Sequence, residues 1–255
     1  MMKSPFAKIK LVVFDVGKTL FDKSSQKEVA PETICALNSL RKQGIKIGVC
    51  TMRTFNHIEE ILPLKFDFFI LNNGAYVMCD GKTILDERID ISVKDKDFLT
   101  CDSHEALYST ELAYKLAQKY GFISDRMGVL EKPNNIVIRT DSTWRKLCLS
   151  LWYKTYSWKD TKIVSLQKKG TSRIKGIRLI LNRYGIKENE FLYFGDGPND
   201  LDVFKKFKYT IAMGNCYPKL LKYAYSQTKE CKDNGVSQFL KNNLLLNLNC
   251  NGNDK

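Results

Sequence analysis

Three short apolar runs mark the N-terminal part of the chain, at residues 9–14, 45–50 and 66–71. Continuous runs of this length are typical of strands that are buried on both faces of a parallel sheet. Between the first two, Pro31 begins a helical pattern that ends at Gly44 and carries apolar side chains on one face. A shorter helix, expected at 55–62 and stopped by Pro63, precedes the third strand.

The pattern changes in the middle of the chain. Two strand-like segments flank Asp80-Gly81, a pair that favours a tight hairpin turn. Beyond the hairpin, apolar spacing predicts further helices and strands, with helices at 103–120 and 142–157 and strands at 135–140 and 161–166. A hairpin followed by helices and short strands indicates an α+β module with an antiparallel sheet.

The first pattern returns after residue 170. Ser172 is placed to cap a helix that ends at Gly185. Alternating strands and helices follow, with strands at 191–194 and 210–213 and helices at 199–207, 218–224 and 236–246. The sequence therefore predicts an α/β fold with a doubly wound parallel sheet. Residues 1–75 and 169–255 are expected to form this core, and residues 76–168 an inserted α+β cap domain.

Composition narrows the classes of function. The chain has 255 residues and a formal net charge of +13, but its lysines are spread along the sequence. We therefore interpret the charge as a basic surface and expect neither nucleic-acid nor membrane binding. The eight cysteines form no C-x-x-C pair, and there are two histidines. This argues against a zinc site and predicts reduced thiols in a cytoplasmic protein. Oligomeric state cannot be predicted from the sequence.

Polar residues follow the predicted strands at the edge where open α/β sheets bind ligands. Asp15, Thr51, Asn73-Gly74 and the segment containing Asp196 and Asp200 each stand at such a position. Any one of them alone is most simply a turn or a helix cap. Together, three carboxylates at one edge would repel one another unless a divalent cation bound them, and oxygen ligands with a phosphate favour Mg²⁺. Arg173, at the start of a helix, is the candidate cation for the phosphate.

These segments resemble the haloacid dehalogenase superfamily, and within it the Cof-like sugar-phosphatase group. The resemblance covers nearly the whole chain. Its four motifs are Phe14-Asp15-Val16-Gly17-Lys18-Thr19-Leu20, Cys50-Thr51-Met52-Arg53, Gly170-Thr171-Ser172-Arg173 and Gly195-Asp196-Gly197-Pro198-Asn199-Asp200. The group usually has Thr-Gly-Arg in the second and Lys at the end of the third. The long interval between the second and third motifs places the cap there, as in that group.

The resemblance implies a phosphatase of small phosphorylated metabolites. Asp15 would attack the phosphorus and form an aspartyl phosphate, which water then hydrolyses. Asp15, the carbonyl of Gly17 and Asp196 would hold Mg²⁺, with Asp200 supporting them. Thr51 and Arg173 would stabilise the phosphoryl group as the other catalytic residues. The implied substrate-binding set is Thr51, Arg53, Asn73, Gly74, Arg173 and Asn199.

One position departs from this family pattern. Most members have a second Asp two residues after the nucleophile as general acid and base, but this chain has Gly17 there, followed by Lys18. Three alternatives follow. The chain is a weak or specialised phosphatase, a phosphosugar-binding or regulatory protein with little turnover, or a nucleic-acid-binding protein with a vestigial cleft. Lys18 could supply a proton, although a solvated lysine is a poor acid near neutrality and a solvent-facing side chain is the simpler interpretation.

Overall fold

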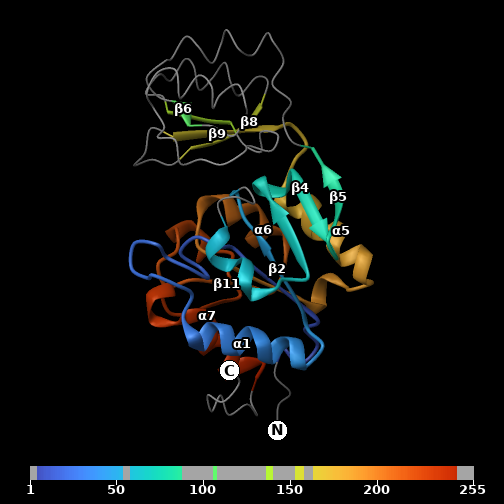
Figure 1. Cartoon of the computed structure of the whole chain (residues 1–255), viewed down its shortest axis with the longest axis vertical. Coiled ribbons are helices and arrows are strands. Elements are labelled where there is room, and N and C mark those ends of the chain that lie inside the picture. The colour runs from blue at the N-terminus through green and yellow to red at the C-terminus, as the bar shows by residue number, and fades with distance from the viewer. Residues whose placement is uncertain are drawn as a thin grey trace.

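The computed structural model describes residues 5–53, 58–87, 106–107, 136–139, 153–157 and 163–245, and these form two β-sheets and the helices around one of them (Figure 1). The strands are β1 Leu11–Phe14, β2 Lys46–Cys50, β3 Phe68–Leu71, β4 Tyr76–Cys79, β5 Lys82–Asp86, β6 Ala106–Leu107, β7 Ile136–Arg139, β8 Tyr153–Ser157, β9 Ile163–Lys168, β10 Phe191–Gly195, β11 Thr210–Ala212 and β12 Ser226–Gln227. The α-helices are α1 Pro31–Lys42, α5 Arg173–Tyr184, α6 Leu201–Lys206 and α7 Gly235–Asn243, and the 3₁₀ helices are η2 Glu59–Leu64, η3 Asn72–Gly74, η4 Glu188–Glu190, η5 Pro198–Asp200, η6 Pro218–Leu220 and η7 Cys231–Asp233.

The larger sheet has the strand order β12-β11-β10-β1-β2-β3-β4-β5. All neighbours from β12 to β3 are parallel, whereas β4 and β5 are antiparallel. From β1 the chain moves to β2 on one side, and it later returns to β10 on the other side. The strand order therefore reverses between β1 and β10, which is where open α/β sheets place their ligand sites.

Helices cover both faces of this sheet, and the alternation along β1 shows why its sequence is continuously apolar. Val12 and Phe14 belong to one buried cluster, which includes side chains of α1 and α7. Leu11 and Val13 belong to a second buried cluster, which includes side chains of α5 and α6. Successive side chains of a strand point to opposite faces, so every position of β1 is buried. The predicted doubly wound α/β core is confirmed.

The ends of α5 follow the sequence prediction. Ser172 accepts a hydrogen bond from the backbone N–H of Lys175 at 3.1 Å, and Gly185 closes the helix with φ 64°. A side chain at Gly185 would be strained, because L-residues rarely adopt that backbone conformation. This helix begins directly at the candidate cation Arg173, so the cap residue also fixes where that side chain starts.

The hairpin around Asp80-Gly81 forms as predicted but joins the larger sheet. Asp80 and Gly81 both have positive φ, 51° and 73°, as the tightest hairpin turns require. β4 pairs with β3, because the chain reverses within η3 and returns along the open edge of the sheet. The boundary expected at residue 76 therefore falls inside the core sheet. The exact division into core and cap stays a proposal.

The smaller sheet is antiparallel, with the order β6-β7-β9-β8. Figure 1 shows it apart from the larger sheet, on the side of β4 and β5. The helix expected at 142–157 is wrong at its end, because 153–157 form strand β8. Its Tyr-Lys-Thr-Tyr-Ser sequence is rich in residues that favour strands, and pairing with β9 decides the outcome. The helix expected at 103–120 is wrong at Ala106–Leu107, which form strand β6. The other residues of that segment and the first part of 142–157 lie outside the described residues.

Several short helices are tighter than predicted. The segments at Glu59–Leu64 and Pro218–Leu220 are 3₁₀ helices, and a 3₁₀ turn precedes the short α6. Too few residues are available in each for a long α-helix, and Pro63 lacks the N–H that a helix interior needs. Within the described parts of the chain, no helix combines the length and apolar character that a membrane span requires.

The cysteines only partly match the expectation of reduced thiols. Cys50, Cys79, Cys216 and Cys231 are free, and all but Cys216 are buried. Cys35, on α1, is disulfide-bonded instead, so the prediction is wrong for this residue. Sequence spacing could not reveal the bond, because a disulfide depends on which chain segments the fold brings together.

Candidate active site

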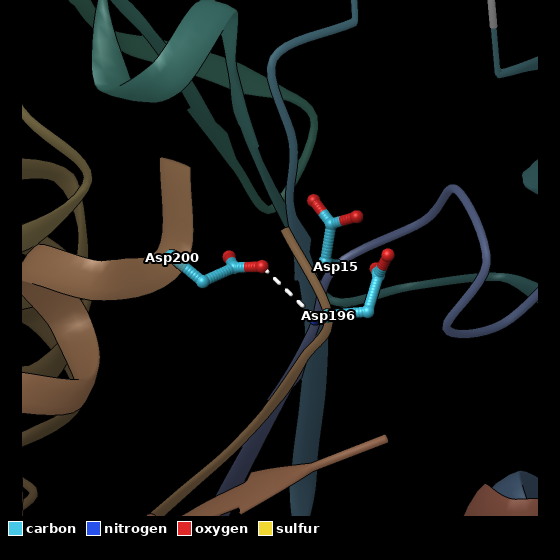
Figure 2. Close-up of side chains that lie close together, drawn as sticks. All are labelled: Asp15, Asp196 and Asp200. Carbon is cyan, nitrogen blue, oxygen red and sulfur yellow. Dashed lines mark hydrogen bonds between the residues drawn. The ribbon is translucent and has the colours of Figure 1, made fainter. Parts of the chain in front are cut away.

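Three carboxylates converge where the strand order reverses. Asp15 follows β1, and Asp196 and Asp200 follow β10, the neighbouring parallel strand. Each offers one oxygen, and these oxygens lie within 4.8 Å of one another (Figure 2). The backbone N–H of Asp15 donates to the carbonyl of Phe194 at 2.9 Å, which fixes the two strand ends in register. The sequence-predicted acidic group is thus brought together by the sheet itself.

Burial changes the acidity of the two carboxyls that face this cluster. Asp15 is only 7% exposed, and burial raises its pKa to about 7, although Arg173 opposes the shift. Burial also holds the pKa of Asp196 well above its usual range, and the charges of Asp15 and Asp200 add to the effect. Loss of water disfavours each charged form, and like charges disfavour both. A cation between the two carboxyls would oppose both effects.

Asp200 has a different environment from the other two. Its side chain is fully buried, and both oxygens accept hydrogen bonds from the protein. One oxygen accepts from Tyr193 Oη at 2.6 Å and from Arg173, and the other accepts from the backbone N–H groups of Asp196 and Gly197 at 3.0 and 2.8 Å. Asp200 therefore holds the turn that carries Asp196 and lies behind the open side of the cluster.

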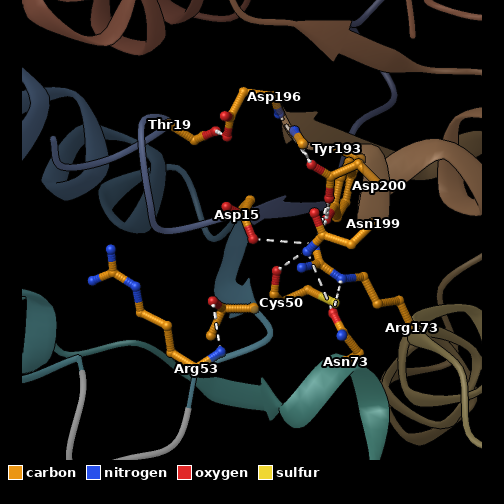
Figure 3. A network of polar contacts seen from close by, with 12 residues as sticks. Asp15, Thr19, Cys50, Arg53, Asn73, Arg173, Tyr193, Asp196, Asn199 and Asp200 are labelled. Carbon is orange, nitrogen blue, oxygen red and sulfur yellow. Dashed lines mark hydrogen bonds and ion pairs between the residues drawn. The ribbon is translucent and has the colours of Figure 1, made fainter. Parts of the chain in front are cut away.

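Arg173 is the buried cation of the site. Its side chain is 2% exposed, and Nη1 lies 3.1 Å from Asp15 Oδ1 and pairs with Asp200. Nη1 also donates to the carbonyl of Cys50 at 3.0 Å and to Tyr193 Oη at 2.7 Å (Figure 3). The other terminal nitrogen, Nη2, is buried without a hydrogen-bond partner. The guanidinium thus links the ends of β1, β2 and β10, and both N–H groups of Nη2 stay unused.

Asn73 and Gly74 bring the end of β3 to this network. Asn73 Oδ1 accepts from Arg173 Nε at 2.9 Å and from Asn199 Nδ2 at 3.4 Å, while its own Nδ2 is buried without a partner. Gly74 has φ 96°, and a Cβ there would lie 2.1 Å from the carbonyl oxygen of Ser172. Only glycine permits this close approach of β3 to the start of α5. Gly74 is therefore needed for packing that sets Asn73 against Arg173.

Sequence reasoning missed two residues of this network. Tyr193 lies inside the apolar run of β10, where an aromatic side chain is indistinguishable from core, yet its hydroxyl bridges Arg173 and Asp200. Thr19 donates its hydroxyl to Asp196 Oδ1 at 2.9 Å. Thr19 stands within the first motif, so its place four residues after the candidate nucleophile was the available signal. The role of the buried Tyr193 hydroxyl could be found only once the fold was known.

Comparison with known proteins assigns the chain to a family. A model of haloacid dehalogenase-like hydrolases matches residues 12–127 and 130–240. The chain belongs to the haloacid dehalogenase-like hydrolases. The family inferred from the four motifs is therefore confirmed, and the carboxylate edge just described is the part of the fold that carries those motifs.

Individual relatives are similar over most of this hydrolase. A candidate bifunctional phosphatase/peptidyl-prolyl cis-trans isomerase of Streptococcus pyogenes is 26% identical over 270 residues, covering 92% of the chain but only 54% of the relative. A candidate phosphatase of Bacillus subtilis, YkrA, is 23% identical, with 91% and 96% of the two chains covered. A solved subclass IIB sugar phosphatase of the superfamily superposes with a TM-score of 0.75 at 22% identity, covering 91% and 98%.

At Gly17, the position that departs from the family motif, a side chain from the end of a different strand fills the neighbouring space. Gly17 has no side chain, and an ideal Cβ there would lie 3.0 Å from Nη2, 3.7 Å from Cζ and 3.8 Å from Nε of Arg53. Arg53 follows β2, and its backbone N–H donates to Thr51 Oγ1 at 3.2 Å. Figure 3 shows its guanidinium and that of Arg173 on opposite sides of Asp15. The space beside Gly17 is therefore cationic in this hydrolase.

Lys18 is not part of the acidic cluster. Its side chain is exposed, as the solvent-facing interpretation predicts, and its φ of 60° lies in the left-handed region. Its carbonyl accepts a hydrogen bond from Asn215 Nδ2 at 3.1 Å, and its N–H donates to the carbonyl of Phe21 at 2.9 Å. The loop therefore makes the turn that glycine usually makes in the family, at the cost of a strained lysine.

Proposed function

We propose that this chain is a Mg²⁺-dependent phosphatase of small phosphorylated metabolites, which passes the phosphoryl group to Asp15 and then to water. The observation that carries the proposal is the arrangement of Asp15 between a second carboxylate, Asp196, and a buried cation, Arg173. A nucleophilic carboxylate needs an opposing positive charge before it can approach an anionic phosphate ester. The family assignment and the phosphatase names of its relatives support the same reaction class.

The residues fit a magnesium ion. Asp15 and Asp196 offer hard oxygen ligands, and burial together with the neighbouring carboxylates raises the pKa of both. Mg²⁺ binds through one or two carboxylates, keeps several waters and accepts phosphate oxygens. Asp15, Asp196 and the carbonyl of Gly17 would hold it, and it would supply charge neutralisation for the phosphoryl oxygens. Asp200 would support this shell by fixing the Asp196 turn.

Unused buried donors support binding of an oxyanion. Arg173 Nη2 and Asn73 Nδ2 are both buried without hydrogen-bond partners. Such groups cost about 1–3 kcal/mol each when they stay unsatisfied, and more when they are charged. Phosphoryl oxygens beside Asp15 would satisfy them, with the buried hydroxyl of Thr51 as a further donor. The free energy of burying these donors without partners is therefore already spent in folding, as expected of a preorganised site.

Gly17, which lacks the carboxylate usual at this position, supports a second candidate function. Without a carboxylate at this position, the same site could bind phosphosugars or serve a regulatory role with little turnover. The cytoplasmic location and the small-metabolite partner predicted from the sequence belong to the same proposal. The buried free thiols of Cys50, Cys79 and Cys231 support that location.

Phosphate release separates the two functions. Wild type and Asp15→Asn are assayed on a panel of phosphate esters with and without Mg²⁺, with Asp233→Asn, an exposed residue of η7, as the matched control. A phosphatase gives Mg²⁺-dependent release that Asp15→Asn abolishes and Asp233→Asn preserves. If all three proteins release phosphate equally, a contaminant acts. If none does while phosphate esters still bind with Mg²⁺, the binding function replaces the catalytic one.

A further inference from the structure

The space beside the candidate nucleophile contains a guanidinium where a proton donor would be expected. The three atoms nearest to an ideal Cβ at Gly17, outside the adjoining residues, all belong to the Arg53 side chain. The charge of Arg53 also acts on Asp15, since it opposes the rise in the pKa of that carboxyl. Arg53 and Arg173 thus approach the same carboxylate from two sides (Figure 3).

Arg53 and a carboxylic acid would act differently on a departing oxygen. A guanidinium stays protonated in proteins, so it stabilises negative charge but does not transfer a proton. A carboxylic acid at this place could protonate the leaving oxygen. Lys18 is no substitute, because its side chain is exposed to solvent, and a solvated lysine is a poor acid near neutrality.

We infer that Arg53 is a specificity-determining residue that selects substrates with acidic leaving groups, namely acyl phosphates and phosphoanhydrides. This inference rests on the proposed function and deepens it. Carboxylate and phosphate leaving groups depart as stable anions near neutrality, so they need a positive charge beside them rather than a proton. An alkoxide leaving group needs the proton that this site does not supply.

The two chemical steps balance without a general acid. In the first, an Asp15 oxygen forms a bond to phosphorus while the bond from phosphorus to the leaving oxygen breaks. The leaving group keeps that electron pair and departs as an anion beside Arg53. In the second, water attacks the phosphorus of the aspartyl phosphate and the bond to Asp15 breaks. Both protons of the water remain on the product, dihydrogen phosphate.

The backbone allows the missing carboxylate to be restored. Gly17 does not have the positive φ that would exclude other residues, and the close neighbour at 3.0 Å is the end of a flexible side chain. Gly17→Asp and the strain control Gly17→Ala are therefore both compatible with the loop. Arg53→Ala removes the cation, and Arg53→Lys keeps the charge without the planar fork.

The test is the dependence of kcat/KM on the acidity of the leaving group. This ratio reports the step in which the leaving group departs, since every substrate gives the same aspartyl phosphate afterwards. The probes are acetyl phosphate, pyrophosphate, p-nitrophenyl phosphate, phenyl phosphate and glycerol phosphate, each with wild type and Asp15→Asn. We expect wild type to turn over the first three far better than the alkyl ester. Arg53→Ala should lower kcat/KM about 10²-fold for the first three, with partial rescue in Arg53→Lys.

Gly17→Asp should raise kcat/KM for glycerol phosphate by about 10²–10⁴-fold and change p-nitrophenyl phosphate little. Gly17→Ala, which adds a Cβ but no acid, should not raise kcat/KM for glycerol phosphate. If wild type hydrolyses alkyl and acidic esters equally, with both rates lost in Asp15→Asn, the inference is overturned and the phosphatase function stands. The same holds if Arg53→Ala leaves the leaving-group dependence unchanged. If no substrate gives an Asp15-dependent rate in wild type or Gly17→Asp, the proposed function itself fails.

Discussion

Replacing Asp200 with Asn tests whether the buried network behind the site holds the loop that carries Asp196. The substitution keeps the shape of the side chain and removes its charge. One oxygen becomes an NH₂ group, which donates and cannot accept. In the protein each oxygen of Asp200 accepts from two donors, one oxygen from Tyr193 and Arg173 and the other from the N–H groups of Asp196 and Gly197.

The expected loss of stability follows from this geometry. Whichever oxygen is replaced, two of the four hydrogen bonds are lost and two donors face an NH₂ group. Hydrogen bonds to a charged acceptor contribute about 1.5–3 kcal/mol each. Breaking a buried ion pair by removing one partner costs about 3–5 kcal/mol, and here Arg173 keeps Asp15 at 3.1 Å. We therefore expect the free energy of unfolding to fall by about 3 kcal/mol.

Urea unfolding followed by circular dichroism measures this change. The matched control is Glu188→Gln, which neutralises a carboxylate paired with Arg178 at 3.2 Å on the surface, where both side chains are about half exposed. Exposed pairs contribute about 0–1 kcal/mol, so the control should barely shift the midpoint. If Asp200→Asn loses no more stability than Glu188→Gln, the network does not hold the loop and the assignment of Asp200 is wrong.

Three further predictions follow from the same structure. Lys18→Gly should raise the free energy of unfolding by about 0.5–1 kcal/mol in urea titration, because it relieves a φ of 60°, whereas Lys82→Gly in edge strand β5 should lower it. Gly48→Ala should lower it by about 1–3 kcal/mol, because the new Cβ would meet the Phe68 ring at 2.4 Å, and a neutral result would contradict that packing. Burial raises the pKa of Asp15 to about 7, so Mg²⁺ must displace a proton below that pH. The affinity of the chain for Mg²⁺, measured by calorimetry, should therefore fall at least about tenfold from pH 6 to pH 5. An affinity that does not change with pH would exclude Asp15 as a ligand.

The sign of this pH dependence also applies to the metal-free chain. The pKa of the Asp15 carboxyl is about 7 in the folded chain and about 3.9 in the unfolded chain. Between about pH 3.9 and pH 7, the carboxyl therefore binds a proton only when the chain is folded. Stability contributed by that proton is present at low pH and is lost as the pH rises through about 7. Added Mg²⁺ should therefore stabilise the protein most at pH 7 and above, where it replaces the lost proton.

The sequence predicted the parallel core because local signals there agree with the final packing. β1 is continuously apolar, and it is covered on both faces; Ser172 and Gly185 bound α5 as cap residues do. Local signals did not determine which sheet β4 and β5 join, because tertiary pairing decides it. The hairpin after η3 reads equally well as the start of a new sheet or as an extension of the old one, and only the free edge of β3 settles the choice.

The candidate site also has a part that the sequence predicts and a part that it does not. Asp15, Asp196 and Asp200 could be placed together from strand ends alone, since parallel strands share an edge. Their different environments could not, because the donors around Asp200 come from Tyr193, a core position in the sequence pattern, and from Arg173 across the sheet. The approach of Arg53 to Gly17 likewise needs coordinates, since these residues belong to loops after different strands.

Intact-mass analysis of acid-quenched protein tests the central claim most directly. The chain is incubated with acetyl phosphate and Mg²⁺, quenched, and digested to locate any acyl phosphate. We predict a mass increase of one phosphoryl group on the peptide that contains Asp15, absent without Mg²⁺ and absent in Asp15→Asn. Phosphorylation at another residue, or equal phosphorylation of Asp15→Asn, would contradict the assignment of Asp15 as the nucleophile.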